Sequence, residues 1–171
     1  MRLILKTSLK SALRTLFQVD NALSFFQVSF IHERFSFKLG NTLLPAALKY
    51  PPFFIDWPTK KDTLYTMLMI DPDMPSRHEP SLREWNHWLL GNMAGPDLST
   101  GDIIAQYISP EPLQDTGYHR ITFLVFEQPK HIQFTEPPLE FDRNDTRRAH
   151  FSWRKFAGKY ELGDPIAINF V

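Results

Sequence analysis

The sequence predicts a mainly β fold, a single domain with a β-sheet and peripheral helices. Short stretches of β-branched and aromatic residues recur along the chain with alternating polarity, as in strands on a half-buried sheet. Few segments have helical spacing. The chain of 171 residues contains 14 prolines but 7 glycines, which predicts stiff connections. Together these features favour one β domain with rigid loops.

The composition limits the classes of function. A chain with 43% hydrophobic and 22% charged residues is typical of globular proteins. Its 19 basic and 19 acidic residues cancel, so no net charge favours nucleic acid or an anionic membrane as the main partner. Cysteine is absent, which favours a reducing compartment and hence a cytoplasmic location. No apolar run reaches the ~20 residues of a transmembrane segment.

Residues 1–20 differ from the rest of the chain. Four basic residues recur at every fourth position, and leucines lie on a neighbouring helical face. The basic residues are Arg2, Lys6, Lys10 and Arg14. We therefore predict an amphipathic helix at 1–20, with a mitochondrial targeting segment as the alternative, and a domain at 21–171.

The strands and helices are predicted from local patterns in chain order. Strands are expected at residues 25–30, 35–39, 53–57, 64–70, 103–108 and 121–127. A helical turn is expected around Pro45, and a helix is expected over residues 151–160. The polar segment 136–148 is predicted to be a surface loop.

Two carboxylates follow the clearest strand. Asp71 and Asp73 flank Pro72 at the end of the apolar stretch 64–70, and extended backbone points two such side chains in similar directions. Two close anions repel, so one of them must gain hydrogen-bond donors, pair with a cation or take up a proton. Each of these outcomes is common at functional sites.

Two histidines are the candidate partners of these carboxylates. His87 lies between Asn86 and Trp88, and His119 precedes the predicted strand at 121–127. An imidazole can be oriented through one ring nitrogen while the other meets a ligand. If the two loops converge on Asp71, the product is a small anion-binding niche. Taken singly, each residue is more typical of a turn or a structural contact.

Several sequence blocks resemble one known family. Residues 71–77 read D-P-D-M-P-S-R, residues 83–88 read R-E-W-N-H-W and residues 117–120 read G-Y-H-R. In order and separation they are similar to the phosphatidylethanolamine-binding protein family, whose hallmarks are D-P-D-x-P-S-R and G-x-H-R. The similarity extends through F-L-V-F-E-Q at 123–128 and F-A-G-K-Y-E-L-G-D-P-I-A at 156–167.

The resemblance implies a β-sheet fold with a shallow pocket for phosphate-like or carboxylate groups, without metal or other cofactor. The pocket residues so implied are Asp71, Pro75, Trp85, His87 and His119, with Tyr107 and Pro112 at the rim. The supporting residues so implied are Asp73, Arg83, Glu84 and Arg120. Cis peptide bonds are implied at Met74–Pro75 and at Arg83–Glu84.

The sequence also departs from the family pattern. Ile121 stands where the family often has a hydroxyl-bearing aromatic residue, which removes one donor from the pocket wall. Asn86 stands at a frequent histidine position. Many relatives continue beyond the position of Val171 into a helix that partly covers the pocket, so a more open and weaker pocket is expected here.

These observations favour a non-catalytic binding or regulatory protein. The expected ligand is a phosphate-bearing small molecule or a phospholipid headgroup, with a signalling protein as a further candidate partner. The resemblance implies lipid binding, kinase regulation or protease inhibition, and fold alone does not choose among them. One rival is a hydrolase in which Asp71, Asp73, His87 and His119 bind a divalent metal. Another is a structural subunit of a larger, mitochondrial assembly with a vestigial pocket.

Overall fold

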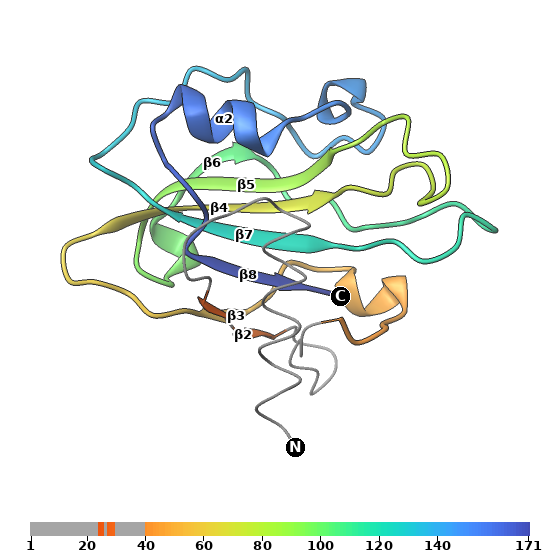
Figure 1. The fold of residues 1–171 in the computed structure, drawn as a ribbon, viewed down its shortest axis with the longest axis horizontal. Helices are drawn as coiled ribbons and strands as arrows, with labels where there is room; N and C mark the ends of the chain where they lie inside the picture. Colours follow the sequence, from red (N-terminus) through yellow and green to blue (C-terminus); the bar gives the residue numbers. More distant parts are fainter. Residues whose placement is uncertain (1–23, 26, 30–39) are drawn as a thin grey trace.

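The computed structural model describes residues 24–25, 27–29 and 40–171. A six-stranded sheet runs in the order β1-β8-β7-β4-β5-β6, and every neighbouring pair is antiparallel except β1 with β8 (Figure 1). Its strands are β1 (Ser24–Phe25), β4 (Leu64–Asp71), β5 (Trp85–Ala94), β6 (Asp102–Ala105), β7 (Thr122–Glu127) and β8 (Ala167–Phe170). A second sheet pairs β2 (Gln27–Ser29) with β3 (Phe54–Asp56).

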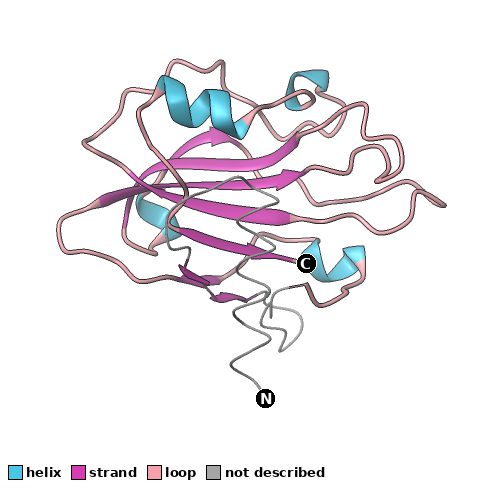
Figure 2. Cartoon of the chain, in the orientation of Figure 1, coloured by secondary structure: helices cyan, strands magenta, loops and turns pink. Residues whose placement is uncertain are grey.

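Helices are short and lie at the periphery, as Figure 2 shows by colour. They are α2 (Trp153–Lys159) and the 3₁₀ helices η1 (Pro45–Leu48), η2 (Leu98–Thr100) and η3 (Thr146–Arg148). Ser152 caps α2 by accepting a hydrogen bond from the Lys155 backbone N–H. Within the described residues, no helix has the length and apolar character needed to cross a membrane.

The six-stranded sheet is buried on both faces. On β4, Met67 and Met69 belong to one hydrophobic cluster, which includes Val28 of β2 and Ile55 of β3. Leu68 belongs to the opposite cluster, which also contains side chains of α2. A strand buried on both faces reads as a continuous apolar run, which explains the sequence of β4.

A β-bulge at His87 changes the alternation of β5. Met69 of β4 pairs with Trp88, but the next residue, Ile70, pairs with Asn86. His87 is therefore the extra residue, and Asn86 lies opposite Ile70 on the face of the α2 cluster. Bulges redirect side chains and are frequent beside functional sites.

The mainly β, single-domain prediction is confirmed, and most predicted elements are present. The strands expected at 53–57, 64–70 and 121–127 correspond to β3, β4 and β7, and the helix expected at 151–160 is α2. The strand expected at 103–108 is shorter, because β6 ends at Ala105. Residues 25–30 contain the end of β1 and the whole of β2. The strand predicted at 35–39 and the helix or targeting segment predicted at 1–20 lie outside the described residues.

Two strands and the 3₁₀ helices η2 and η3 were not predicted, and one prediction needs correction. β5 lacks simple alternation because both faces are buried and a bulge interrupts it, and β8 has only four residues. The segment 136–148 is not entirely a surface loop. It ends in η3, where the side chain of Arg148 is fully buried.

Candidate functional site

The two aspartates after β4 form a compact turn. Asp71 is the last residue of the strand, and both aspartates are buried, with whole-residue exposed fractions of 2% for Asp71 and 0% for Asp73. The Asp73 backbone N–H donates to Asp71 Oδ1 at 2.7 Å. The peptide bond between Met74 and Pro75 is cis, as the resemblance implied. The turn therefore fixes both carboxylates close to each other.

Asp73 is neutralised by Arg120. The guanidinium donates to Asp73 Oδ2 from Nε at 2.8 Å and to Oδ1 from Nη2 at 2.6 Å. The Arg120 backbone N–H donates to Oδ2 at 3.0 Å. Burial is the largest influence on Asp73 and favours its neutral form, but the hydrogen bonds and charge of Arg120 hold the pKa of Asp73 below its usual value of 3.8. The pair of Asp73 with Arg120 thus holds the turn after β4 against the loop that carries His119.

Asp71 is paired with His119. Asp71 Oδ2 lies 2.6 Å from His119 Nδ1, and both side chains are 3% exposed. On its other side, His119 Nε2 lies 3.0 Å from the hydroxyl of Thr116, which donates its own proton to the Leu113 carbonyl at 2.7 Å. Because that proton is used, the Thr116 oxygen must accept from His119 Nε2–H. Nδ1–H then donates to the carboxylate, so His119 is an imidazolium.

The electrostatics of His119 agree with this assignment. The hydrogen bond to Asp71 raises the pKa of His119 above its usual value of 6.5, against the opposing effect of burial. The stability that the charged His119 contributes to the folded state is therefore fully present below pH 6.5, and it is lost as the pH rises through the raised pKa. A positive charge therefore lies beside Asp71 below pH 6.5.

His87 is in the opposite state. Its Nδ1 lies 3.1 Å from the Ile108 carbonyl oxygen, which can only accept, so Nδ1 carries the proton. Burial lowers the pKa of His87 to about 4, and the nearby charge of Asp71 only partly opposes this effect. His87 is therefore neutral, with an unprotonated Nε2. That atom is buried and has no hydrogen-bond partner among the described residues.

The structure thus brings three of the predicted residues into electrostatic contact. Asp71 and His119 are in direct contact, and the charges of both act on His87. We call the group of Asp71, His87 and His119 the anion niche, after the ligand that the sequence predicts for it. It combines one carboxylate, one imidazolium and one neutral imidazole with a free acceptor atom.

The other predicted pocket residues have different positions. Trp85 is buried and pairs with Asp71 across the β4–β5 ladder, and the backbone of Pro75 contributes to the raised pKa of His119. The Tyr107 hydroxyl donates to the Leu48 carbonyl, and the ring packs edge-on against Trp88 at 5.5 Å. The Tyr107 hydroxyl is therefore engaged in the core beside η1. Pro112 is half-buried in the loop that leads to His119.

The predicted supporting residues brace the site from two sides. Arg83 donates from Nε to the Pro72 carbonyl at 2.6 Å. The Arg83–Glu84 peptide bond is cis, as the resemblance implied. Glu84 Oε2 accepts from the Trp153 backbone N–H at 3.2 Å, at the start of α2. Burial raises the pKa of Glu84. Arg83 therefore holds the aspartate turn, whereas Glu84 holds the start of β5 against α2.

Thr116 and Arg148 were not predicted from the sequence. Thr116 determines the protonation of His119, and its position three residues before His119 is the only sequence signal for it. Arg148 donates to the carbonyls of Asn86 at 2.9 Å, Gln106 at 2.9 Å and Glu140 at 2.7 Å. It thereby joins β5 to the segments after β6 and before η3. A lone arginine in a polar segment gives no sequence signal for burial.

Replacing Arg148 with methionine is expected to destabilise the fold by about 2 kcal/mol, because buried carbonyls lose their donor while the desolvation of the guanidinium is relieved. Urea unfolding of the variant measures this change. Arg143→Met is the matched control, since Arg143 is exposed and pairs with the exposed Glu111. Equal stability of Arg148→Met and wild type would show that the three carbonyl contacts contribute nothing.

Metal chemistry gains no support from the geometry. In the described part of the chain, no three histidine, aspartate or glutamate side chains converge as metal ligands. His119 Nδ1 and Nε2 are both engaged as donors, and Asp73 is saturated by Arg120. Of the four residues of the hydrolase alternative, Asp71, Asp73 and His119 are thus linked by hydrogen bonds, whereas His87 is bonded to the Ile108 carbonyl.

The family match identifies the class to which this fold and site belong. A family model described as phosphatidylethanolamine-binding protein matches residues 33–169. The chain therefore belongs to the phosphatidylethanolamine-binding protein family, as the sequence blocks indicated. Proteins named among its relatives are binding or inhibitor proteins.

One curated relative is putative odorant-binding protein A5 of Drosophila melanogaster, which is 39% identical over 130 residues. The match covers 76% of this chain and 61% of the relative, so the chain spans less than two thirds of that protein. Among solved structures, the solution structure of CG7054 is 34% identical, with a TM-score of 0.69 and coverage of 88% of this chain and 85% of that one.

Two more distant structures show the same fold. Phosphatidylethanolamine-binding protein from Plasmodium vivax is 21% identical, with a TM-score of 0.70 and coverage of 95% of this chain and 94% of that one. Carboxypeptidase Y inhibitor, solved in complex with its cognate proteinase, is 21% identical, with a TM-score of 0.70 and coverage of 85% and 80%.

Proposed function

We propose that this protein is a non-catalytic binding protein whose anion niche holds a phosphate-like group. The observation that carries the proposal is that the two histidines have different protonation states. His119 is a buried imidazolium beside Asp71, and His87 Nε2 is a buried acceptor without a partner. Buried polar atoms are rarely left unpaired, so the Nε2 atom calls for a ligand that supplies a proton.

A phosphate monoanion satisfies both histidines. One of its oxygens keeps a proton and can donate to His87 Nε2, while its negative charge is attracted by the His119 imidazolium. A phosphate monoester such as phosphoethanolamine has the same acid–base chemistry near its second ionisation, whereas a diester phospholipid headgroup has no such proton on its phosphate. The niche thereby selects a protonated anion. A catalytic role is not proposed, because no side chain in the niche is arranged as a nucleophile with its base.

The proposals for the partner and the location rest on the sequence and on the names of the relatives and not on the geometry of the site. The names of the relatives support binding of a small ligand or of a protein, and they leave open kinase regulation, protease inhibition and a phosphate-bearing signalling partner. A cytoplasmic monomer remains the simplest expectation, with the mitochondrial location and the structural-subunit role as alternatives. One relative is named an odorant-binding protein, and this name makes a secreted location a further alternative.

Calorimetric titration with inorganic phosphate and with phosphoethanolamine tests the proposal. His119→Ala removes the positive charge that attracts the anion, and Asp71→Ala removes the carboxylate that keeps His119 charged and in place, so both are expected to weaken binding about ten- to a hundredfold. His131→Ala is the matched control, because His131 is exposed and lies outside the niche. Circular dichroism at the titration temperature verifies that each variant is folded. Titrations that are unchanged in both niche variants would refute the proposal.

A further inference from the structure

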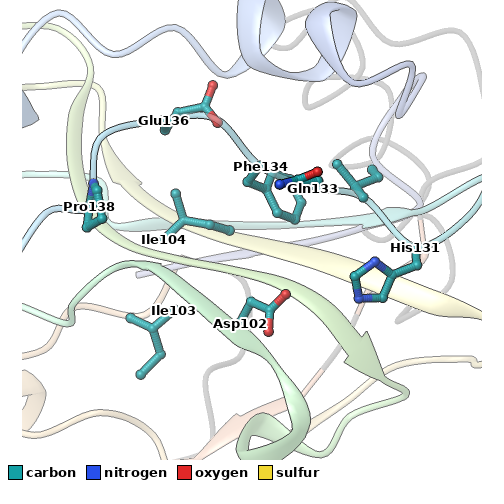
Figure 3. A pocket seen from close by; sticks show the side chains of 9 residues that line it. Asp102, Ile103, Ile104, His131, Gln133, Phe134, Glu136 and Pro138 are labelled. Atoms are coloured by element: carbon teal, nitrogen blue, oxygen red, sulfur yellow. The ribbon is translucent and has the colours of Figure 1, made fainter.

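The face of the sheet covered by α2 contains two adjoining hollows that are separate from the anion niche. The larger hollow has a volume of about 440 Å³ and is open (Figure 3). In this view, Ile104 and Phe134 lie between the carboxylates of Asp102 and Glu136. Both carboxylates are already engaged, Asp102 by Asn92 at 2.7 Å and Glu136 by Lys159 at 2.7 Å. The two carboxylates of the larger hollow are therefore already paired.

The smaller hollow, which we call the Asn86 crevice, is different. Its volume is about 130 Å³, and it shares Ile104 and Glu136 with the larger hollow. Its remaining walls are mainly apolar and include Leu89, Ala105 and Leu139. Leu89 and Ala105 are fully buried members of the hydrophobic cluster beneath α2. None of the three residues of the anion niche lines it.

One polar group lies deep in this apolar wall. Asn86 is 1% exposed, and its Oδ1 is buried without a hydrogen-bond partner among the described residues. The bulge at His87 places Asn86 opposite Ile70, on the same face of the sheet as Leu89. A buried amide oxygen without a donor costs free energy that a ligand with an O–H group would recover.

A single water molecule is a poor occupant of the crevice. Buried waters make about three hydrogen bonds, whereas the other polar side chains of the wall are already engaged. Arg147 is paired with Asp145 at 2.5 Å, and Glu136 accepts from Lys159. An apolar cavity of about 150 Å³ in another protein stays dry and accommodates benzene, so the Asn86 crevice has the size for one aromatic ring.

We propose that the Asn86 crevice is a second ligand site, which takes a small apolar molecule carrying one hydroxyl group. The apolar body occupies the space between Leu89, Ala105 and Leu139, and the hydroxyl donates to Asn86 Oδ1. This site goes beyond the proposed anion binding and is independent of it, since it lies among different residues and selects an uncharged ligand.

The test uses phenol and toluene as probes, titrated into the full chain and followed by ¹H–¹⁵N NMR. Phenol is expected to bind saturably, with shift changes at the crevice residues. In Asn86→Leu the phenol-to-toluene affinity ratio should fall about tenfold or more, because the variant lacks the acceptor while retaining the apolar walls. The ratio cancels any general change in the shape of the crevice.

A second variant guards against misfolding of the first. Leu139→Trp should fill the mouth of the crevice and weaken both probes at least tenfold, whereas Leu113→Trp, at an exposed leucine outside it, should bind as wild type does. Saturating phosphate should leave phenol binding unchanged. The proposal is overturned by an absence of saturable phenol shifts, by an unaltered ratio in Asn86→Leu, by full binding in Leu139→Trp or by displacement of phenol with phosphate.

Discussion

Replacing Asp73 with alanine is expected to destabilise the protein by about 3–5 kcal/mol, the usual cost of removing one partner of a buried ion pair. The carboxylate is fully buried and accepts three hydrogen bonds from Arg120, which would lose them all. The loop that carries His119 is held to the aspartate turn through this pair. Urea unfolding near neutral pH measures the loss.

The matched control is Glu111→Ala, which removes the carboxylate of an exposed pair with Arg143. Exposed pairs contribute about 0–1 kcal/mol, so this variant should be nearly as stable as wild type. The pH dependence gives a further check. The pKa of Asp73 is lowered in the folded state, so its contribution is present above pH 3.8 and is lost as the pH falls through the lowered value. Equal destabilisation by both variants would contradict the buried ion pair.

Sulfate binding is expected to weaken about tenfold for each unit of pH between about pH 5 and pH 6.5, whereas phosphate binding changes little. The lone pair of His87 Nε2 repels an anion that carries no proton, so sulfate can bind only if His87 takes one up. Burial holds the pKa of free His87 at about 4, so this uptake is less favourable at each higher pH. Phosphate brings its own proton over this range.

The pH range is chosen to separate the two histidines. His119 has a raised pKa and remains charged below pH 6.5, so a change of affinity in this range reports His87. Calorimetry with both anions measures the two slopes, and His87→Gln should flatten the slope for sulfate. Parallel pH profiles for sulfate and phosphate would be inconsistent with a neutral His87 in the niche.

The sequence allowed the fold class and the convergence of Asp71 and His119 to be predicted. Prolines at the end of β4 marked the turn, and apolar runs marked β4 and β7. Strand β5 was not predicted, because the bulge at His87 and burial on both faces remove any simple alternation of polar and apolar residues. Such a bulge arises from the register of β5 against β4 and has no local pattern.

The protonation states of the site could not be read from residue types. His87 is neutral because its Nδ1 meets the Ile108 carbonyl and its ring is buried, and His119 is charged because Thr116 and Asp71 both accept from it. Both conditions depend on tertiary contacts between loops. The burial of Arg148 has the same origin, since its carbonyl partners come from three separate segments.

Imidazole NMR of the histidines with and without phosphate tests the anion niche most directly. The ¹⁵N shifts of His87 should identify a neutral ring with protonated Nδ1 in the free protein, and those of His119 an imidazolium. Adding phosphate at about pH 6 should shift His87 Nε2 as it gains a donor, and should leave the exposed His131 unchanged. Saturating phosphate without a shift at His87 Nε2 would contradict the proposed site.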